Sequence, residues 1–141
     1  MITNRKTDYK FDLEKFTNVN GKTGIYVQYA QVRAKRLQQS ISQQKNEMES
    51  LVLSDVDKQL LSQLFMFGYF LEQSSSLNEP HHLANYLYDI SNSFNQFYEH
   101  EKLSEINDIN HLSSKLYLIN LFLTTSENVM FCLGMKPVDK M

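Results

Sequence analysis

Apolar residues recur at helical spacing in several long segments of this chain, and this pattern limits its fold more than any other feature. Positions three and four residues apart share one face of an α-helix, and residues 56–71 show that period most clearly. Glycine (4) and proline (2) are scarce, which leaves few turn residues for a sheet-rich fold. A chain of 141 residues is one domain by length. We therefore expect an all-α fold, an antiparallel helical bundle of four main helices.

The first two helices are predicted at residues 24–45 and from Ser54 onward. Ser54 precedes Asp55 and Asp57, and a capping serine followed by acidic residues is a typical helix start. The run QSSSLN at residues 73–78 is polar, so we expect the second helix to end before it and a loop to follow.

The third and fourth helices also have recognisable limits. Asn78 is expected to cap the third helix, with Pro80 in its first turn. The polar segment 105–111 is predicted to be a turn, and the fourth helix is predicted at residues 112–133. Gly134 is a natural C-terminal stop for that helix.

Three of these helices have apolar positions that we expect to face the core. Cys132 also lies on a predicted apolar face, so it is interpreted as a buried structural thiol. The inward positions are Ala30, Ala34, Leu37 and Ile41 in the first helix, Tyr86, Ile90, Phe94, Phe97 and Tyr98 in the third, and Leu116, Ile119, Leu123, Met130 and Leu133 in the fourth.

The first helix carries a second face, beside its apolar one, that is aromatic and basic. Tyr26, Tyr29, Arg33 and Arg36 fall within an arc of about 80° when successive residues turn by 100°. Aromatic rings stack on unpaired bases and guanidinium groups meet phosphates, so this face suits single-stranded nucleic acid. The alternatives are core packing for the tyrosines and a structural ion pair for Arg33.

Charge is distributed unevenly along the chain, although the net charge is only −2. Residues 1–36 hold eight Lys/Arg and three Asp/Glu, whereas residues 37–141 hold six and thirteen. The positive charge therefore gathers around the Tyr/Arg helix, and a basic patch on an acidic body can attract phosphates.

The residues that enzymes and metal sites require are not found in a usable arrangement. Neither form of glycine-rich phosphate-binding loop occurs. His81 and His82 are adjacent, so on a helix their side chains are expected to diverge by about 100° and to chelate a metal poorly. Cys132 is the single cysteine, which excludes an internal disulfide and favours a reducing, cytoplasmic setting. We predict no catalytic, cofactor or metal site, and no segment that spans a membrane.

Three separated blocks of the sequence resemble one known family. They are NRKTDYKFDLEKFTNVNGKTGIYVQYAQVRAKRL, EPHHLANYLYDISNSFNQFYEHEKL and the ending ENVMFCLGMKPVDKM. In this order they are similar to the C-terminal part of arginyl-tRNA synthetases, and together they cover nearly the whole chain. The resemblance is weakest over residues 38–78, where only the helical pattern matches.

This resemblance implies an all-α anticodon-binding domain of the DALR type at residues 21–141. Residues 1–20 are then the tail of the catalytic domain or a linker. The HIGH and KMSK motifs of class I catalysis are absent, so the chain is expected to be a piece of a longer arginine–tRNA ligase, whose ATP and Mg lie with the catalytic domain. The implied partners are the anticodon loop of an arginine tRNA and that catalytic domain, in a cytoplasmic monomer.

The resemblance also implies individual contacts with the tRNA. Tyr26, Tyr29 and Met141 match the family's anticodon-loop contacts, and Arg33 matches the arginine of the same motif. Asn85 matches the block that begins the third helix, whereas Arg36 is included for its place on the helix face alone. The sequence departs from many relatives at two positions, where proline and histidine are replaced by Ile25 and Gln31.

Two alternative functions remain open at the level of sequence. One is the anticodon domain of another synthetase, such as the cysteine, methionine or β-type glycine enzyme. The other is a free-standing helical adaptor that binds a protein through the acidic body of the chain.

Overall fold

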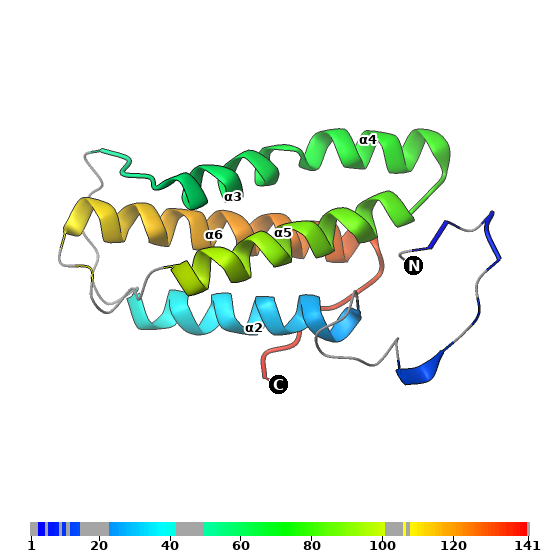
Figure 1. The fold of residues 1–141 in the computed structure, drawn as a ribbon, viewed down its shortest axis with the longest axis horizontal. Coiled ribbons are helices and arrows are strands. Elements are labelled where there is room, and N and C mark those ends of the chain that lie inside the picture. Colours follow the sequence, from blue (N-terminus) through cyan, green and yellow to red (C-terminus); the bar gives the residue numbers. More distant parts are fainter. Residues whose placement is uncertain are drawn as a thin grey trace.

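The computed structural model describes residues 3–4, 6–8, 10, 12–14, 23–41, 50–100, 106 and 108–140. These residues contain no strand. The helices whose bounds fall within the described residues are α2 (Gly24–Ile41), α3 (Asp55–Phe65), α4 (Phe67–Leu77), α5 (His81–His100) and α6 (Ile109–Cys132). Helices α3 and α4 follow each other almost end to end, so they act as one arm of a four-membered bundle (Figure 1). The expected all-α bundle is confirmed.

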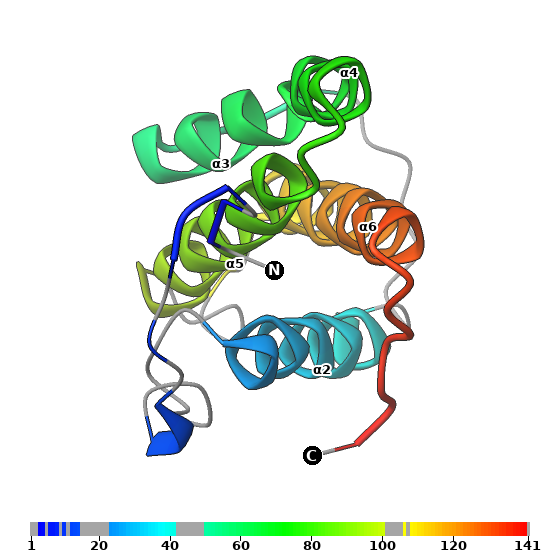
Figure 2. The same ribbon diagram turned by 90° about the vertical axis from the view of Figure 1, so that its right-hand side faces the viewer.

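Helix α5 lies at the centre of this bundle. It packs against α2 on one side, against α3 and α4 on the other, and against α6 behind (Figures 1 and 2). The grooves between α5 and α2 and between α5 and the α3–α4 arm therefore have α5 as a wall. Both cavities described below have this origin.

The core is built where α5 and α6 meet and where α2 covers them. Phe94 of α5 stacks on Phe122 of α6 with ring centroids 4.2 Å apart. Ala30 and Ala34 are fully buried in α2, and such small side chains let that helix approach its neighbours closely. The predicted inward stripes of the first, third and fourth helices are thereby confirmed, except at Tyr98.

Helix α3 starts where the sequence predicts. The Ser54 side chain accepts a hydrogen bond from the Asp57 backbone N–H at 3.3 Å, and the Asp57 carboxylate accepts one from the Ser54 N–H at 2.9 Å. This reciprocal pair is a capping box, which satisfies two of the backbone donors left open at a helix start.

Replacement of Ser54 by alanine is expected to lower the free energy of unfolding by about 1 kcal/mol, because the cap loses its acceptor. Urea unfolding followed by circular dichroism measures this loss. Ser62→Ala, at an exposed position of the same helix, is the matched control and should change stability by only a few tenths of a kcal/mol. Equal effects of the two changes would contradict the role of the cap.

The expected loop at residues 73–78 is wrong. The arm breaks instead at Met66, and α4 continues through the serine run to Leu77. Asn78 has a left-handed backbone, with φ of 53°, and the Glu79 N–H donates back to the Ser74 carbonyl at 3.0 Å. Asn78 therefore ends α4 rather than capping α5, because asparagine is one of the few residues that tolerate this conformation.

The fourth helix begins three residues earlier than predicted and ends as predicted. The Asp108 carboxylate accepts hydrogen bonds from the N–H groups of Asn110 and His111, so part of the expected turn at 105–111 is already helix. At the other end Gly134 has a φ of 69°, and the Met135 N–H donates to the Met130 carbonyl at 2.8 Å. This pattern is a Schellman motif.

The expected burial of Cys132 is wrong, since the residue is exposed in the last turn of α6. Val129 and Met130 occupy the inward side of that turn, which leaves Cys132 facing outward. The predicted end of the first helix, at residues 42–45, lies outside the described residues. The boundary between residues 1–20 and 21–141 stays a prediction.

Candidate nucleic-acid interface

A groove between α2 and α5 gathers three of the predicted site residues. Tyr26, Tyr29 and Arg33 project from α2 toward a polar stripe of α5 and enclose a cavity of about 220 Å³. The stripe of α5 contributes Asn92, Asn95, Gln96 and Glu99. The predicted Tyr/Arg face is therefore one wall of a groove and not an isolated helix surface.

Arg33 is held in place by rings on two helices. Its guanidinium carbon lies 4.6 Å from the ring centroid of Tyr29 and 4.4 Å from that of Tyr98. Its nitrogens donate to the Asn95 amide oxygen at 3.1 Å and to the Tyr29 hydroxyl at 3.2 Å. Arg33 also lies 3.7 Å from a Glu99 carboxylate oxygen. These contacts fix the Arg33 guanidinium group between the two rings, in the wall of the groove.

The two tyrosines of α2 differ in how much of the ring is free. The Tyr26 ring packs on Tyr88 with centroids 5.1 Å apart, and its hydroxyl donates to the Asn92 amide oxygen at 3.2 Å. Tyr29 is 39% exposed. Tyr29 therefore offers the larger surface for a stacking partner, while Tyr26 joins α2 to α5.

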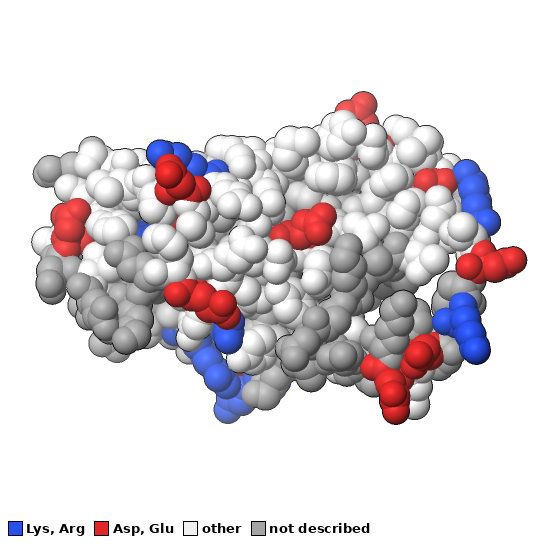
Figure 3. Space-filling view, in the orientation of Figure 1, with Lys and Arg blue, Asp and Glu red and all other residues white. Residues whose placement is uncertain are grey.

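Positive charge around the groove is more neutralised than the sequence suggests. Arg33 faces Glu99, and Lys35 pairs with Asp139 at 3.0 Å. Figure 3 shows a largely uncharged face on which blue side chains at the lower edge lie beside red ones. The groove is thus an aromatic and amide-lined surface with a balanced charge, which suits bases better than a run of phosphates.

Residues 27–141 match the family described as the DALR anticodon binding domain. The chain belongs to this family. Among curated relatives it is 32% identical, over 95% of its length, to an arginine–tRNA ligase from Alkaliphilus oremlandii, and 34% identical, over 77% of its length, to one from Francisella tularensis subsp. novicida. The chain spans 23% and 20% of the length of these two relatives.

Solved structures give the same picture of this DALR domain. It superposes on an arginyl-tRNA synthetase from Plasmodium falciparum with a TM-score of 0.80 at 29% identity, covering 99% of this chain and 25% of that one. The Thermus thermophilus arginyl-tRNA synthetase gives a TM-score of 0.86 at 22% identity, covering 99% of this chain and 25% of that one, which supports the fold. No described helix of the domain is long and apolar enough to cross a membrane.

The other predicted contacts of the DALR domain lie away from the cavity or outside the described residues. Arg36 is exposed one turn beyond Arg33, and Asn85 is half-buried near the start of α5 without lining the groove. Met141 lies outside the described residues. The preceding tail is held by Gln28, whose amide donates to the Lys136 carbonyl at 2.8 Å and accepts from the Val138 N–H at 3.1 Å.

Gln31, one of the two departures from many relatives, lies inside the protein. It is fully buried, and its amide nitrogen donates to the Ser126 hydroxyl at 2.5 Å, so it joins α2 to α6. A direct contact of this side chain with RNA does not fit that position. The Gln31 side chain supports the groove only by fixing where α2 sits.

The contribution of α5 to the groove is what the sequence prediction missed. Tyr98, expected to face the core, is 37% exposed and covers Arg33 instead. A signal was available, because the four polar residues of the stripe recur at i, i+3, i+4 and i+7, which places them on one helix face. That signal identifies a polar face without showing which helix it meets.

The adjacent histidines do not diverge as expected. The rings of His81 and His82 lie 4.1 Å apart and both turn toward Glu79, with His82 Nε2 3.3 Å from a Glu79 oxygen. The Lys6 ammonium takes the other Glu79 oxygen at 2.8 Å, and this bond, with help from the histidines, holds the pKa of Glu79 below its usual value. Glu79, His81 and His82 each offer one possible metal-ligand atom, and these three atoms lie within 4.8 Å of one another. In this structure the Lys6 ammonium binds the same carboxylate.

Proposed function

We propose that this chain is the anticodon-binding domain of an arginine–tRNA ligase and that its α2–α5 groove holds the anticodon loop of an arginine tRNA. The supporting observation is the groove itself, where an exposed tyrosine and a positioned arginine face a row of amide side chains. Unpaired bases stack on aromatic rings and pair with amides, and such contacts are how single-stranded RNA is recognised.

Each groove residue then has a separate task. Tyr29 stacks on an unpaired base, Tyr26 supports the groove from beside it, and Arg33 with Arg36 faces the phosphates. Asn95 and Gln96 offer hydrogen bonds to base edges. Asn85 and Met141 contact the RNA outside the cavity.

The parent enzyme would attach arginine to its tRNA with ATP. ATP and Mg would bind its catalytic domain, which is a further partner of this chain, and the enzyme would act as a cytoplasmic monomer. Recognition of the tRNA would be the share of this chain in that reaction.

The test is binding of this chain to purified tRNAs for arginine, cysteine, methionine and glycine, measured by fluorescence anisotropy between about 50 and 200 mM salt. We expect the arginine tRNA to bind most tightly. Its affinity should fall with salt, by a slope of about 0.7 in log units for each single-strand phosphate contacted. Preference for one of the other tRNAs would assign the domain to another synthetase. Failure to bind any of the four would contradict RNA recognition and favour a protein-binding adaptor.

A further inference from the structure

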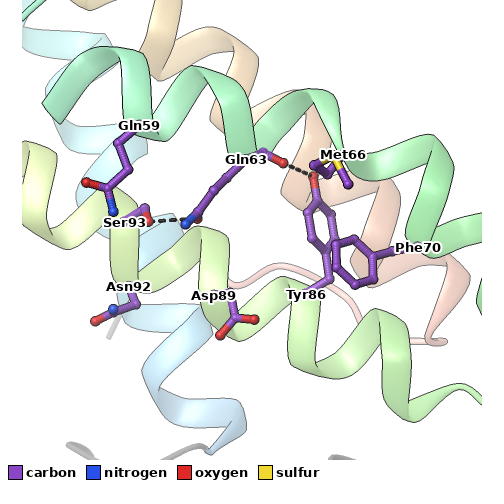
Figure 4. A pocket seen from close by; sticks show the side chains of 8 residues that line it. All are labelled: Gln59, Gln63, Met66, Phe70, Tyr86, Asp89, Asn92 and Ser93. Carbon is purple, nitrogen blue, oxygen red and sulfur yellow. Dashed lines mark hydrogen bonds between the residues drawn. The ribbon is translucent and has the colours of Figure 1, made fainter. Parts of the chain in front are cut away.

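A second cavity opens on the other side of α5, beneath the α3–α4 arm. It measures about 230 Å³ (Figure 4). Cavities for drug-sized ligands begin at about 300 Å³, so this one suits a single flat ring system. Its lining residues are Gln59, Gln63, Met66, Phe70, Tyr86, Asp89, Asn92 and Ser93.

The aromatic wall of this cavity is rigid. Phe70 stacks on Tyr86 with ring centroids 4.8 Å apart and an interplanar angle of 23°. The Tyr86 hydroxyl donates to the backbone carbonyls of Gln63 and Leu64, each at 3.1 Å, and so ties α5 to the end of α3 (Figure 4). The break of the arm at Met66 adds a flexible thioether beside these rings. Tyr86 is only 2% exposed, so the flat apolar face of the cavity is the Phe70 ring, which Tyr86 backs.

The polar groups that line the cavity include a hydrogen-bond donor and an acceptor. The Ser93 hydroxyl donates to the Gln63 amide oxygen at 2.7 Å, which orients that amide and leaves its nitrogen as a donor. The Asp89 carboxylate also lines the cavity, although it points away from Gln63 and Ser93 in Figure 4, and it can only accept when ionised. Among the described residues no lysine or arginine lines the cavity, which favours an uncharged base over a phosphate. The Watson–Crick edge of a base with an exocyclic amine matches this arrangement.

The second cavity shares one lining residue with the α2–α5 groove. Asn92 lines both, and its amide oxygen accepts the Tyr26 hydroxyl proton at 3.2 Å. Asp89 and Gln96, one from each cavity, are about 10 Å apart along the helix axis at 1.5 Å per residue. Stacked nucleotides are spaced by about 3.4 Å, so bases in the two cavities must be unstacked from each other.

We propose that the α3–α5 cavity is a second base pocket. It takes one unpaired adenine, cytosine or guanine of the same RNA strand that enters the α2–α5 groove, stacks it on the Phe70 ring, and holds its exocyclic amine on Asp89. This inference rests on the proposed function. It adds a specificity-determining surface that lies outside the Tyr/Arg helix.

The test couples protein variants to RNA positions. The probe is an RNA stem-loop with the anticodon loop of an arginine tRNA, made with one loop base removed at a time. Binding to the chain is measured for the unchanged protein and for Asp89→Asn, Tyr29→Ala and Glu127→Gln. Glu127 is an exposed acidic residue of α6, so its variant reports the general effect of losing one negative charge.

Asp89→Asn is expected to bind the intact loop about five- to tenfold more weakly than Glu127→Gln does. A weakening is informative because loss of a negative charge alone would strengthen RNA binding. Removal of one particular base should abolish this difference, and replacing that base by uracil should weaken binding of the unchanged chain by about the same factor as Asp89→Asn. Tyr29→Ala should couple to a different loop position.

Two outcomes would overturn the inference in distinguishable ways. If Asp89→Asn behaves as Glu127→Gln at every loop position while Tyr29→Ala couples to one, the groove binds RNA and the second pocket does not. If the unchanged chain fails to bind the stem-loop, the proposed function and the second pocket both fall. Circular dichroism of each variant establishes that it is folded.

Discussion

Replacement of Lys115 by methionine is expected to lower the free energy of unfolding by about 3–5 kcal/mol, the largest effect predicted for one substitution in this chain. The Lys115 ammonium lies 2.8 Å from each carboxylate oxygen of Asp57, and both side chains are 1% exposed. Without Lys115 the Asp57 charge stays buried and has lost its countercharge. Urea unfolding followed by circular dichroism measures the loss.

The matched control removes the charge as well as its partner. In Asp57→Asn with Lys115→Met no buried charge is left over, and the asparagine oxygen can still accept the Ser54 N–H as Asp57 does now. The double variant should therefore recover a large part of the stability lost by Lys115→Met. If Lys115→Met lowers the free energy of unfolding by less than about 1 kcal/mol, the buried ion pair contributes little to stability. A double variant no more stable than the single one would place the loss in the packing of the lysine stem.

Local sequence chemistry predicted the helix limits only where one residue decides them. Ser54 and Gly134 act through their own side chain or backbone, and both lie where the sequence placed them. The serine run before Asn78 was misjudged because serine is compatible with both loop and helix, and packing on α5 decides between them. The burial of Lys115 could not be predicted from its local sequence either. Lysine is rarely buried unless it is paired, and its partner here, Asp57, is distant in sequence.

The sequence predicted the α2 side of the candidate interface but not its α5 side. Helical periodicity placed Tyr26, Tyr29 and Arg33 on one face of α2, and the groove contains all three. Their α5 partners depend on how two helices dock, which periodicity within one helix does not define. Arg33 is an example: its guanidinium group is held in the groove wall by Tyr98 and Asn95 of α5, and the pattern within α2 does not predict these partners.

Tyr29→Ala is the substitution expected to weaken RNA binding most. Stacking of a base on an aromatic ring contributes roughly 1–3 kcal/mol, so the arginine tRNA should bind about five- to 150-fold more weakly. Tyr29 is exposed at one edge of its groove, so the fold should survive the change. Anisotropy with labelled tRNA measures the affinity, and Tyr117→Ala, at an exposed tyrosine of α6, is the matched control.

Tyr29→Phe separates the ring from its hydroxyl. The phenylalanine keeps the surface on which a base stacks and the face that covers the Arg33 guanidinium carbon at 4.6 Å, and it loses only the acceptor for the Arg33 N–H. If stacking dominates, Tyr29→Phe should bind the tRNA within about threefold of the unchanged chain, because one exposed hydrogen bond contributes little. If Tyr29→Phe falls as far as Tyr29→Ala, the hydroxyl acts by aligning Arg33, and the guanidinium group rather than the ring carries the contact with RNA. If Tyr29→Ala binds as well as Tyr117→Ala, neither group of Tyr29 touches RNA and the groove loses its proposed role.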